Sequence, residues 1–318
     1  MSDSTGEEPN FDEIRGLIAR LPGPDLDAAG AAATRAAALR HRGDELGALA
    51  AHGEWLAAWQ GRARPAVERP RIAVFAANHG VAARLPAPSW STQDWVEDTV
   101  AGKTALNRIA TELDADLRIY ELALEQPSGD FTSGPALSEA DCARAMAYGM
   151  MTVEEGFDLM VLGGFGWRND LAARALAAAL LGGAAEDWSE HEADSRLLAE
   201  GLERHRQASE DPLQALRRFG GLEMAAVAGA ILACRLARLP VVLDGLTCLA
   251  AGAALRRLDP RLLDHCRAAS DGGDIAARRL LEALQLPHLA ALQSAQGSGI
   301  AGAAALPLLR AAARALDA

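Results

Sequence analysis

The chain has little of several features that mark particular classes of protein. Aromatic residues make up only 4% of its 318 residues, and 31 Lys and Arg face 43 Asp and Glu, which gives a formal net charge of −12. Binding to nucleic acid needs clustered Lys and Arg that neutralise phosphates, so this balance argues against nucleic acid as the main partner. A small anionic substrate stays compatible with it, because a local nest of backbone N–H groups can hold one.

Cysteines and long apolar runs are also scarce. The four cysteines show no Cys-x-x-Cys spacing: Cys142, Cys234, Cys248 and Cys266. They predict reduced, mostly buried thiols of a cytoplasmic protein, and neither a disulfide framework nor a zinc site. The apolar runs are rich in alanine and broken by Arg, Asp or Gly, which predicts no signal peptide and no membrane-spanning segment. We expect no metal or other cofactor.

Half of the residues are hydrophobic, enough for one large α/β domain or for a large domain with a small one. The polar residues 1–9 predict a disordered N-terminus. From Phe11 to about Gln60, apolar positions recur at helical spacing and predict two or three helices without a strand. We therefore divide the chain into a helical segment, residues 1–65, that is part of a small domain, and an α/β domain, residues 66–318. C-terminal elements are candidates to complete the small domain.

Short apolar segments alternate with helical ones over the rest of the chain. Strands are expected at 71–77, 117–122, 159–162 and 240–245, with a strand or loop at 265–270. Helices are expected from Ser91 or Thr92 toward Lys103, at 104–113, from Ser138 to about Glu155, at 222–232, at 275–284 and after Gly299. Residues 184–211 predict a helix and a surface connection. This alternation is typical of a doubly wound, mostly parallel sheet with helices on both faces.

The segment 157–183 combines a strand, a glycine-rich turn and a helix. Apolar residues 159–162 lead through Gly163 and Gly164 into an alanine- and leucine-rich helix. This order places backbone N–H groups and a helix dipole at the end of a sheet, where an anion can bind. The alternative is a tight connection without a ligand.

Other strands also end in polar or glycine residues. They are Asn78-His79-Gly80 and Asp244-Gly245, with a loop near Asp130 as a further candidate. Ends of parallel strands meet at one edge of a sheet, so their convergence predicts a ligand site there. His79 could equally be an exposed turn residue. Glu223, the one charge in an apolar helix, could equally be a partner of the helix dipole.

The order of these motifs resembles the nicotinate-nucleotide–dimethylbenzimidazole phosphoribosyltransferases. The matching segments are VFAANHGVAA (74–83), GKTALN (102–107), DFTSGPALS (130–138), LGGFGWRND (162–170), DPLQALRRFGGLEMAAVAGAIL (211–232), PVVLDG (240–245) and QGSGIAGAAALPLLRAA (296–312). The resemblance implies a doubly wound sheet, a small helical domain and a homodimer. It also implies transfer of phosphoribose from nicotinate mononucleotide to a benzimidazole nitrogen, in cobalamin lower-ligand assembly.

Several site positions depart from the family pattern. Gln296 stands where the family has the glutamate taken as the general base, and an amide cannot accept that proton. Gly164 stands at a second family glutamate, Asp170 and Leu171 replace hydroxyl residues, and Arg168 replaces a glycine. These changes gather at the site while the packing segments remain, which fits a changed or lost activity.

Further departures lie in the loops. The acid of the family's GDHGV motif is absent beside Asn78, and the loop that lines the benzimidazole pocket is shortened, with Trp90 near the usual Gln-Glu. The glycine-rich GxGTGxD motif is missing from 188–196, and a family histidine is missing near 272–279.

Two hypotheses follow. In the first, the chain is a phosphoribosyltransferase with an altered acceptor or reduced activity. Arg168 and the backbone of 166–169 would hold the phosphate, His79 and Gln296 would contact the acceptor base, and Asp244 would lie near the ribose. The remaining candidate contacts are Asn78, Trp90, Gly164, Gly166, Asn169, Glu223, Gly297 and Ser298.

In the second hypothesis, the chain has lost catalysis and acts as a ligand-binding or regulatory subunit. It would then form a homodimer or a heterodimer with an active paralogue. The missing glutamates motivate this alternative.

Overall fold

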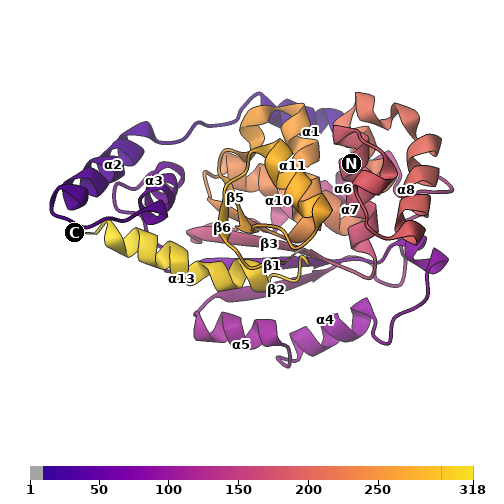
Figure 1. Ribbon diagram of the computed structural model, residues 1–318, viewed down its shortest axis with the longest axis horizontal. Helices are drawn as coiled ribbons and strands as arrows, with labels where there is room; N and C mark the ends of the chain where they lie inside the picture. The colour runs from indigo at the N-terminus through magenta and orange to yellow at the C-terminus, as the bar shows by residue number, and fades with distance from the viewer. Residues whose placement is uncertain (1–9, 295, 318) are drawn as a thin grey trace, which may run out of the picture.

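The computed structural model describes residues 10–294 and 296–317, so the N-terminus predicted to be disordered lies outside the described residues. At its centre is a parallel six-stranded sheet in the order β2-β1-β3-β4-β5-β6 (Figure 1). The strands are β1 (Pro70–Ala76), β2 (Asp116–Glu121), β3 (Leu159–Phe165), β4 (Val241–Asp244), β5 (Cys266–Ser270) and β6 (His288–Ala290). The expected parallel α/β fold is confirmed.

Helices cover both faces of the sheet. The helices are α1 (Phe11–Ile18), α2 (Leu26–His41), α3 (Ala48–Gln60), α4 (Thr92–Val100), α5 (Ala105–Glu112), α6 (Glu139–Met151), α7 (Asn169–Leu181), α8 (Glu192–Arg204), α9 (Pro212–Phe219), α10 (Leu222–Leu236), α11 (Gly245–Leu258), α12 (Ile275–Leu284) and α13 (Ile300–Ala315). Short 3-10 turns are η1 (Gly80–Arg84), η2 (Ala185–Asp187), η3 (Arg206–Glu210) and η4 (Pro260–Leu263).

Alternate residues of the central strands enter two separate cores. Ala73 and Phe75 of β1 pack with α6, α7, α10 and α11, whereas Ile72 and Val74 pack with α5 and α13. Both sets are fully buried. Burial on both faces explains why the central strands are continuous apolar runs, as is usual in parallel sheets.

The N-terminal segment forms three helices and no strand within its described residues, as predicted. Helices α2 and α3 pack with the end of α13 around Ala32, Ala57 and Leu316, and they project at one end of the molecule (Figure 1). A Cβ on Gly53 of α3 would lie 2.3 Å from Leu316 Cδ1. Helix α1 instead packs on the main core through Phe11 and Ile14.

Several expected boundaries differ from the structure, and α10 runs to Leu236, four residues past its expected end at Leu232. Strand β3 continues through Gly163 and Gly164 to Phe165, so the turn before α7 is shorter than predicted. Helix α6 ends at Met151, four residues before the predicted end, and the Thr152 hydroxyl then donates to the Gly149 carbonyl. The separate helix α9, capped by Asp211, and the short strand β6 were not predicted.

Helices α6 and α10 cross with their backbones in contact. A Cβ on Gly149 would lie 1.8 Å from the Ala226 carbonyl oxygen, and one on Gly229 would lie 1.9 Å from that of Met146. Glycine is therefore required at both positions. This close packing fixes the start of α10, which carries Glu223.

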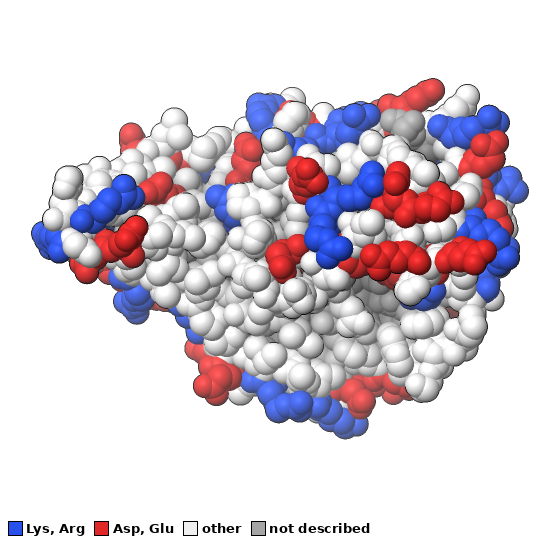
Figure 2. Space-filling model, in the orientation of Figure 1, with Lys and Arg blue, Asp and Glu red and all other residues white. Residues whose placement is uncertain are grey.

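The surface charge, the state of the cysteines and the length of the apolar helices can each be compared with the predictions from composition. Figure 2 shows Lys and Arg interspersed with Asp and Glu on the face that it draws. All four cysteines are buried, and none is bonded to another. No helix in residues 10–294 or 296–317 is long and apolar enough to cross a membrane.

Candidate functional site

A cavity of about 510 Å³ opens at the carboxyl ends of β3 and β4. In a doubly wound sheet, ligands bind beyond the carboxyl ends of the strands, near the point where the strand order reverses. Here that point lies between β1 and β3. The cavity is lined by Leu85, Trp90, Phe165, Gly166, Trp167, Arg168, Asn169, Asp170, Arg174, His191, Ala193, Asp194, Leu246, Thr247, Asp274, Gln296 and Gly297.

Close backbone approaches build the floor of the cavity. A Cβ on Gly166 would lie 2.1 Å from the Ala77 carbonyl oxygen, so the turn after β3 passes directly against the end of β1. A Cβ on Gly245 would lie 2.4 Å from Gly297 N, and one on Gly163 would lie 2.5 Å from Gly297 O. These glycines let the loop before α13 lie on the ends of β3 and β4, which brings Gln296 to the cavity.

Aromatic side chains form one wall. The rings of Trp90 and Trp167 meet nearly at right angles, at 83° with centroids 5.7 Å apart. The ring centroid of Phe165 lies 5.6 Å from that of Trp90, and Trp95 stacks on Phe165 with the centroids 4.0 Å apart. Such a wall can hold a planar ring by stacking and by edge-to-face contacts. The Trp167 backbone N–H donates to the Thr92 hydroxyl at 3.0 Å, which links this wall to α4.

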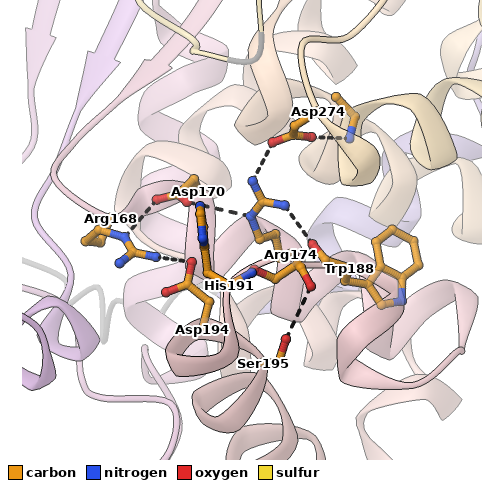
Figure 3. A network of polar contacts seen from close by, with 10 residues as sticks. Arg168, Asp170, Arg174, Trp188, His191, Asp194, Ser195 and Asp274 are labelled. Carbon is orange, nitrogen blue, oxygen red and sulfur yellow. Dashed lines mark hydrogen bonds and ion pairs between the residues drawn. The ribbon is translucent and has the colours of Figure 1, made fainter.

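An ion-pair network lines the cavity as well (Figure 3). Arg168 lies between Asp194, with Nη2 2.7 Å from Oδ2, and Asp170, with Nε 3.2 Å from Oδ1. Arg174 donates to the Trp188 carbonyl, pairs with Asp274 and lies 3.6 Å from Asp170.

This network determines the charge of the cavity. Burial works against the charged form of Arg168, but Asp170 and Asp194 outweigh it and raise the pKa of the guanidinium. Two arginines and three aspartates leave one net negative charge. Arg168 also has a left-handed backbone, with φ of 61°, at the N-cap of α7. This conformation is strained for a residue with a side chain.

The buried side chains of His79 and Glu223 form a pair close to Gly164 of β3. The Nε2 of His79 and the Oε1 of Glu223 are 2.7 Å apart, and their side chains are 1% and 0% exposed. The second oxygen of Glu223 has no hydrogen-bond partner among the described residues. A Cβ on Gly164 would lie 2.7 Å from Thr247 Cγ2 and 3.6 Å from Glu223 Cγ, so the pair sits just behind β3.

Asp244, the last residue of β4, is also fully buried. Its Oδ2 accepts a hydrogen bond from the backbone N–H of Gly302 at 3.1 Å, so it caps α13 from another element. Burial raises the pKa of its carboxyl to about 7, against the opposing effect of backbone N–H groups at the start of α13. Asp244 therefore anchors the helix that follows the Gln296 loop.

The structure brings together six of the candidate residues at the cavity: Trp90, Gly166, Arg168, Asn169, Gln296 and Gly297. Six others are not among the lining residues: Asn78, His79, Gly164, Glu223, Asp244 and Ser298. His79 was expected to contact the acceptor base, but its ring faces Glu223. Asn78 was expected at the ligand, but its amide donates to the Leu124 carbonyl at 2.8 Å.

Several lining residues were not singled out from the sequence. Arg174 and Asp274 lie far apart in the chain, and only the fold joins them. Asp194 lies in the polar segment predicted as a surface connection, although its side chain is 7% exposed. The spacing of Asp170 and Arg174, four residues apart on a helix, was the one local signal.

Comparison with known proteins gives a consistent result. A family model described as phosphoribosyltransferase matches residues 21–318. The nicotinate-nucleotide–dimethylbenzimidazole phosphoribosyltransferase of Allorhizobium ampelinum is 44% identical over 95% of this chain and 92% of its own length. The enzyme of the same name from Agrobacterium fabrum is 43% identical over 95% of this chain and 91% of its own length.

Solved structures agree with the sequence comparisons. The crystal structure of the enzyme of this name from Thermus thermophilus superposes with a TM-score of 0.77 at 30% identity, and the match covers 96% of this chain and 94% of that one. The chain therefore belongs to the nicotinate-nucleotide–dimethylbenzimidazole phosphoribosyltransferase family.

Proposed function

We propose that the chain transfers phosphoribose from nicotinate mononucleotide to a nitrogen of 5,6-dimethylbenzimidazole or a related planar base, in the cavity at the ends of β3 and β4. Full-length relatives with 44% and 43% identity carry that name. The observation that carries the proposal is that the aromatic wall of Trp90, Phe165 and Trp167 and the Arg168 network line the same cavity. A planar base fits the wall, and a phosphate fits the arginine.

The chemistry needs few groups from the protein. The bond between ribose C1′ and the pyridinium nitrogen breaks, and its electron pair goes to the released nicotinate. The lone pair of the acceptor nitrogen forms the new bond to C1′, and the acceptor's N–H proton is then lost. Positive charge on the ribose in the transition state is favoured by the net negative cavity.

We assign roles to the lining residues in that reaction. Trp90 and Trp167 hold the acceptor ring, and Gln296, which is exposed at the cavity, hydrogen-bonds a ring nitrogen. Gln296 cannot take the acceptor proton, so the proton passes to water. General base catalysis typically contributes about 10² to 10⁴ in rate, so we expect turnover below that of a glutamate-bearing relative. Arg168 and the start of α7 receive the phosphate.

The buried acids support the site and do not touch the substrates in this proposal. The His79–Glu223 pair packs close to Gly164 at the end of β3. Asp244 binds the start of α13 and so helps to position the Gln296 loop that precedes this helix. Ser298, 6% exposed, lies within that loop. The Gly164 carbonyl accepts a hydrogen bond from the Asn169 amide at 2.9 Å, which supports Asn169 as a positioning residue.

We also propose a small domain formed by the N-terminal helices with C-terminal elements, and a homodimer in the cytoplasm. The packing of α2 and α3 on the end of α13 supports the first. The family resemblance supports the dimer, and four buried, unbonded cysteines are compatible with a reducing compartment.

Turnover tests the proposal. The purified full chain is incubated with nicotinate mononucleotide and dimethylbenzimidazole, and free nicotinate and ribosylated base are measured by chromatography. We expect both products in equal amounts. Absence of both with dimethylbenzimidazole and with other azole or phenolic acceptors would refute the proposal.

A further inference from the structure

The guanidinium of Arg168, which we propose binds the substrate phosphate, is already paired with two of the protein's own carboxylates. Arg168 stands at the N-terminus of α7, where the helix dipole favours negative charge. Its Nη2 is bound by Asp194 and its Nε by Asp170. A substrate anion therefore has to displace a carboxylate in order to bind these two nitrogens of Arg168.

The Asp194 contact is the closer and the more buried of the two. Its oxygen lies 2.7 Å from Arg168, against 3.2 Å for Asp170, and the Asp194 side chain is 7% exposed against 41% for Asp170. Asp194 lies in the first turn of α8, whose N-cap residue His191 also lines the cavity. The pair thus connects the start of α7 to the first turn of α8 (Figure 3).

We infer that the Asp194 carboxylate occupies the place of the substrate phosphate on Arg168, so that the two anions compete for one guanidinium. This inference rests on the proposed function for the identity of the phosphate ligand. Phosphate can bind the planar guanidinium through two parallel hydrogen bonds, as a carboxylate can. Asp194 therefore lowers the affinity for the nucleotide, and phosphate binding frees the first turn of α8 from α7.

The competition can be measured without turnover. Isothermal titration calorimetry with inorganic phosphate, and then with ribose 5-phosphate, is done on the full chain and on Asp194→Asn. Loss of the competing charge should tighten the Kd for both ligands by about tenfold, a charge-assisted hydrogen bond being worth at least that factor. Asp194→Glu keeps a competing carboxylate and should stay near wild type.

Asp274→Asn is the matched control. It removes one negative charge from the same cavity, but its partner is Arg174, and an asparagine can still cap α12 in the place of Asp274. We expect a clearly smaller gain in phosphate affinity than for Asp194→Asn. Adding Arg168→Gln to Asp194→Asn should abolish the gain. Thermal unfolding of each variant verifies folding, and Asp194→Ser replaces Asp194→Asn if the latter does not fold.

Three outcomes would overturn the inference. They are unchanged or weaker phosphate binding by folded Asp194→Asn, an equal gain in Asp274→Asn, or a gain that survives Arg168→Gln. Failure here is distinct from failure of the proposed function. A wild-type protein that releases nicotinate while Asp194→Asn gains no affinity contradicts only the competition, and a gain without any turnover contradicts only the function.

Discussion

The imidazole of His79 and the carboxylate of Glu223 lie 2.7 Å apart in the interior, although the residues are 144 positions apart in the chain. His79 follows the carboxyl end of β1 and Glu223 lies in the first turn of α10, so the contact ties this strand end to the helix. Removing one partner of a buried hydrogen bond is costly because the remaining polar group is left unsatisfied.

We therefore predict that Glu223→Ala lowers the free energy of unfolding by about 3 kcal/mol, because it leaves a ring nitrogen of His79 without a partner and a cavity in the core. Glu223→Gln keeps an oxygen that can accept from His79 and should cost less than about 1.5 kcal/mol. Urea unfolding of the three proteins checks this order. Equal losses in the two variants, or a loss near zero in Glu223→Ala, would show that the pair does not stabilise the fold.

Substitution at Gly164 tests the close packing between the end of β3 and Thr247. An added Cβ would lie 2.7 Å from Thr247 Cγ2, so Gly164→Ala should cost about 1–3 kcal/mol of stability by overpacking. Thr247→Ser removes that methyl group and should recover part of the loss in the double variant, which a double-mutant cycle measures.

Gly30→Ala is the control for this series. A Cβ on Gly30, in α2, meets nothing within 4 Å, and the substitution should be neutral or slightly stabilising. Additive losses at 164 and 247 would mean that the two residues do not compete for space. A glutamate at 164, where the family resemblance implies one, would require the same room.

Much of the fold could be predicted because its signals are local. Ser91 with Asp94 and Ser138 with Asp141 cap α4 and α6 through hydrogen bonds within one turn, and the sequence spacing indicates both. The central strands are apolar throughout because both of their faces are buried. The end of β3 was missed because glycine is unusual within a strand, yet Gly163 and Gly164 are needed there for close contacts with Gly297 and Thr247.

The site was predictable only in part. Trp90, Arg168 and Gln296 were candidates from motif position, and all three line the cavity. The pairing of Arg168 with Asp194 and that of His79 with Glu223 were not predictable, because each contact joins separate elements of the fold. Sequence spacing cannot reveal which buried side chains meet across such distances.

Asp244 predicts a dependence of stability on pH. Its carboxyl has a pKa of about 7 in the folded protein, against 3.8 for an ordinary aspartate. The folded state therefore binds more protons than the unfolded state between these values, and the free energy of unfolding falls as pH rises from about 4 to about 7. The contribution is fully present below about pH 4, is lost above about pH 7, and is roughly 4 kcal/mol in size.

Asp244→Asn removes this contribution and retains an oxygen that can accept from Gly302. Denaturant unfolding of both proteins at a series of pH values between about 4 and about 8 gives the difference directly. We expect the wild-type protein to lose more stability across this range than the variant. Parallel curves for the two proteins would contradict the assignment of the pH dependence to Asp244.

Trp90 tests the aromatic wall. Trp90→Ala should raise the KM for the acceptor base by about tenfold with a small effect on kcat, since stacking on one aromatic ring is typically worth about 1–3 kcal/mol. Trp90→Phe should retain most of the affinity. Tyr148→Ala is a matched control, because Tyr148 is 40% exposed against 39% for Trp90 and lies outside this cavity. A similar change of KM in both alanine variants would argue against the wall as the acceptor site.

The central claim is that this cavity transfers phosphoribose to an acceptor base. Initial rates of nicotinate release from nicotinate mononucleotide, with and without dimethylbenzimidazole, test it for the wild-type protein and for Gln296→Glu. We predict release that depends on the acceptor and equals the ribosylated base formed, with a higher kcat in Gln296→Glu, by up to about 10². No release by either protein, or release that is independent of the acceptor, would contradict the account.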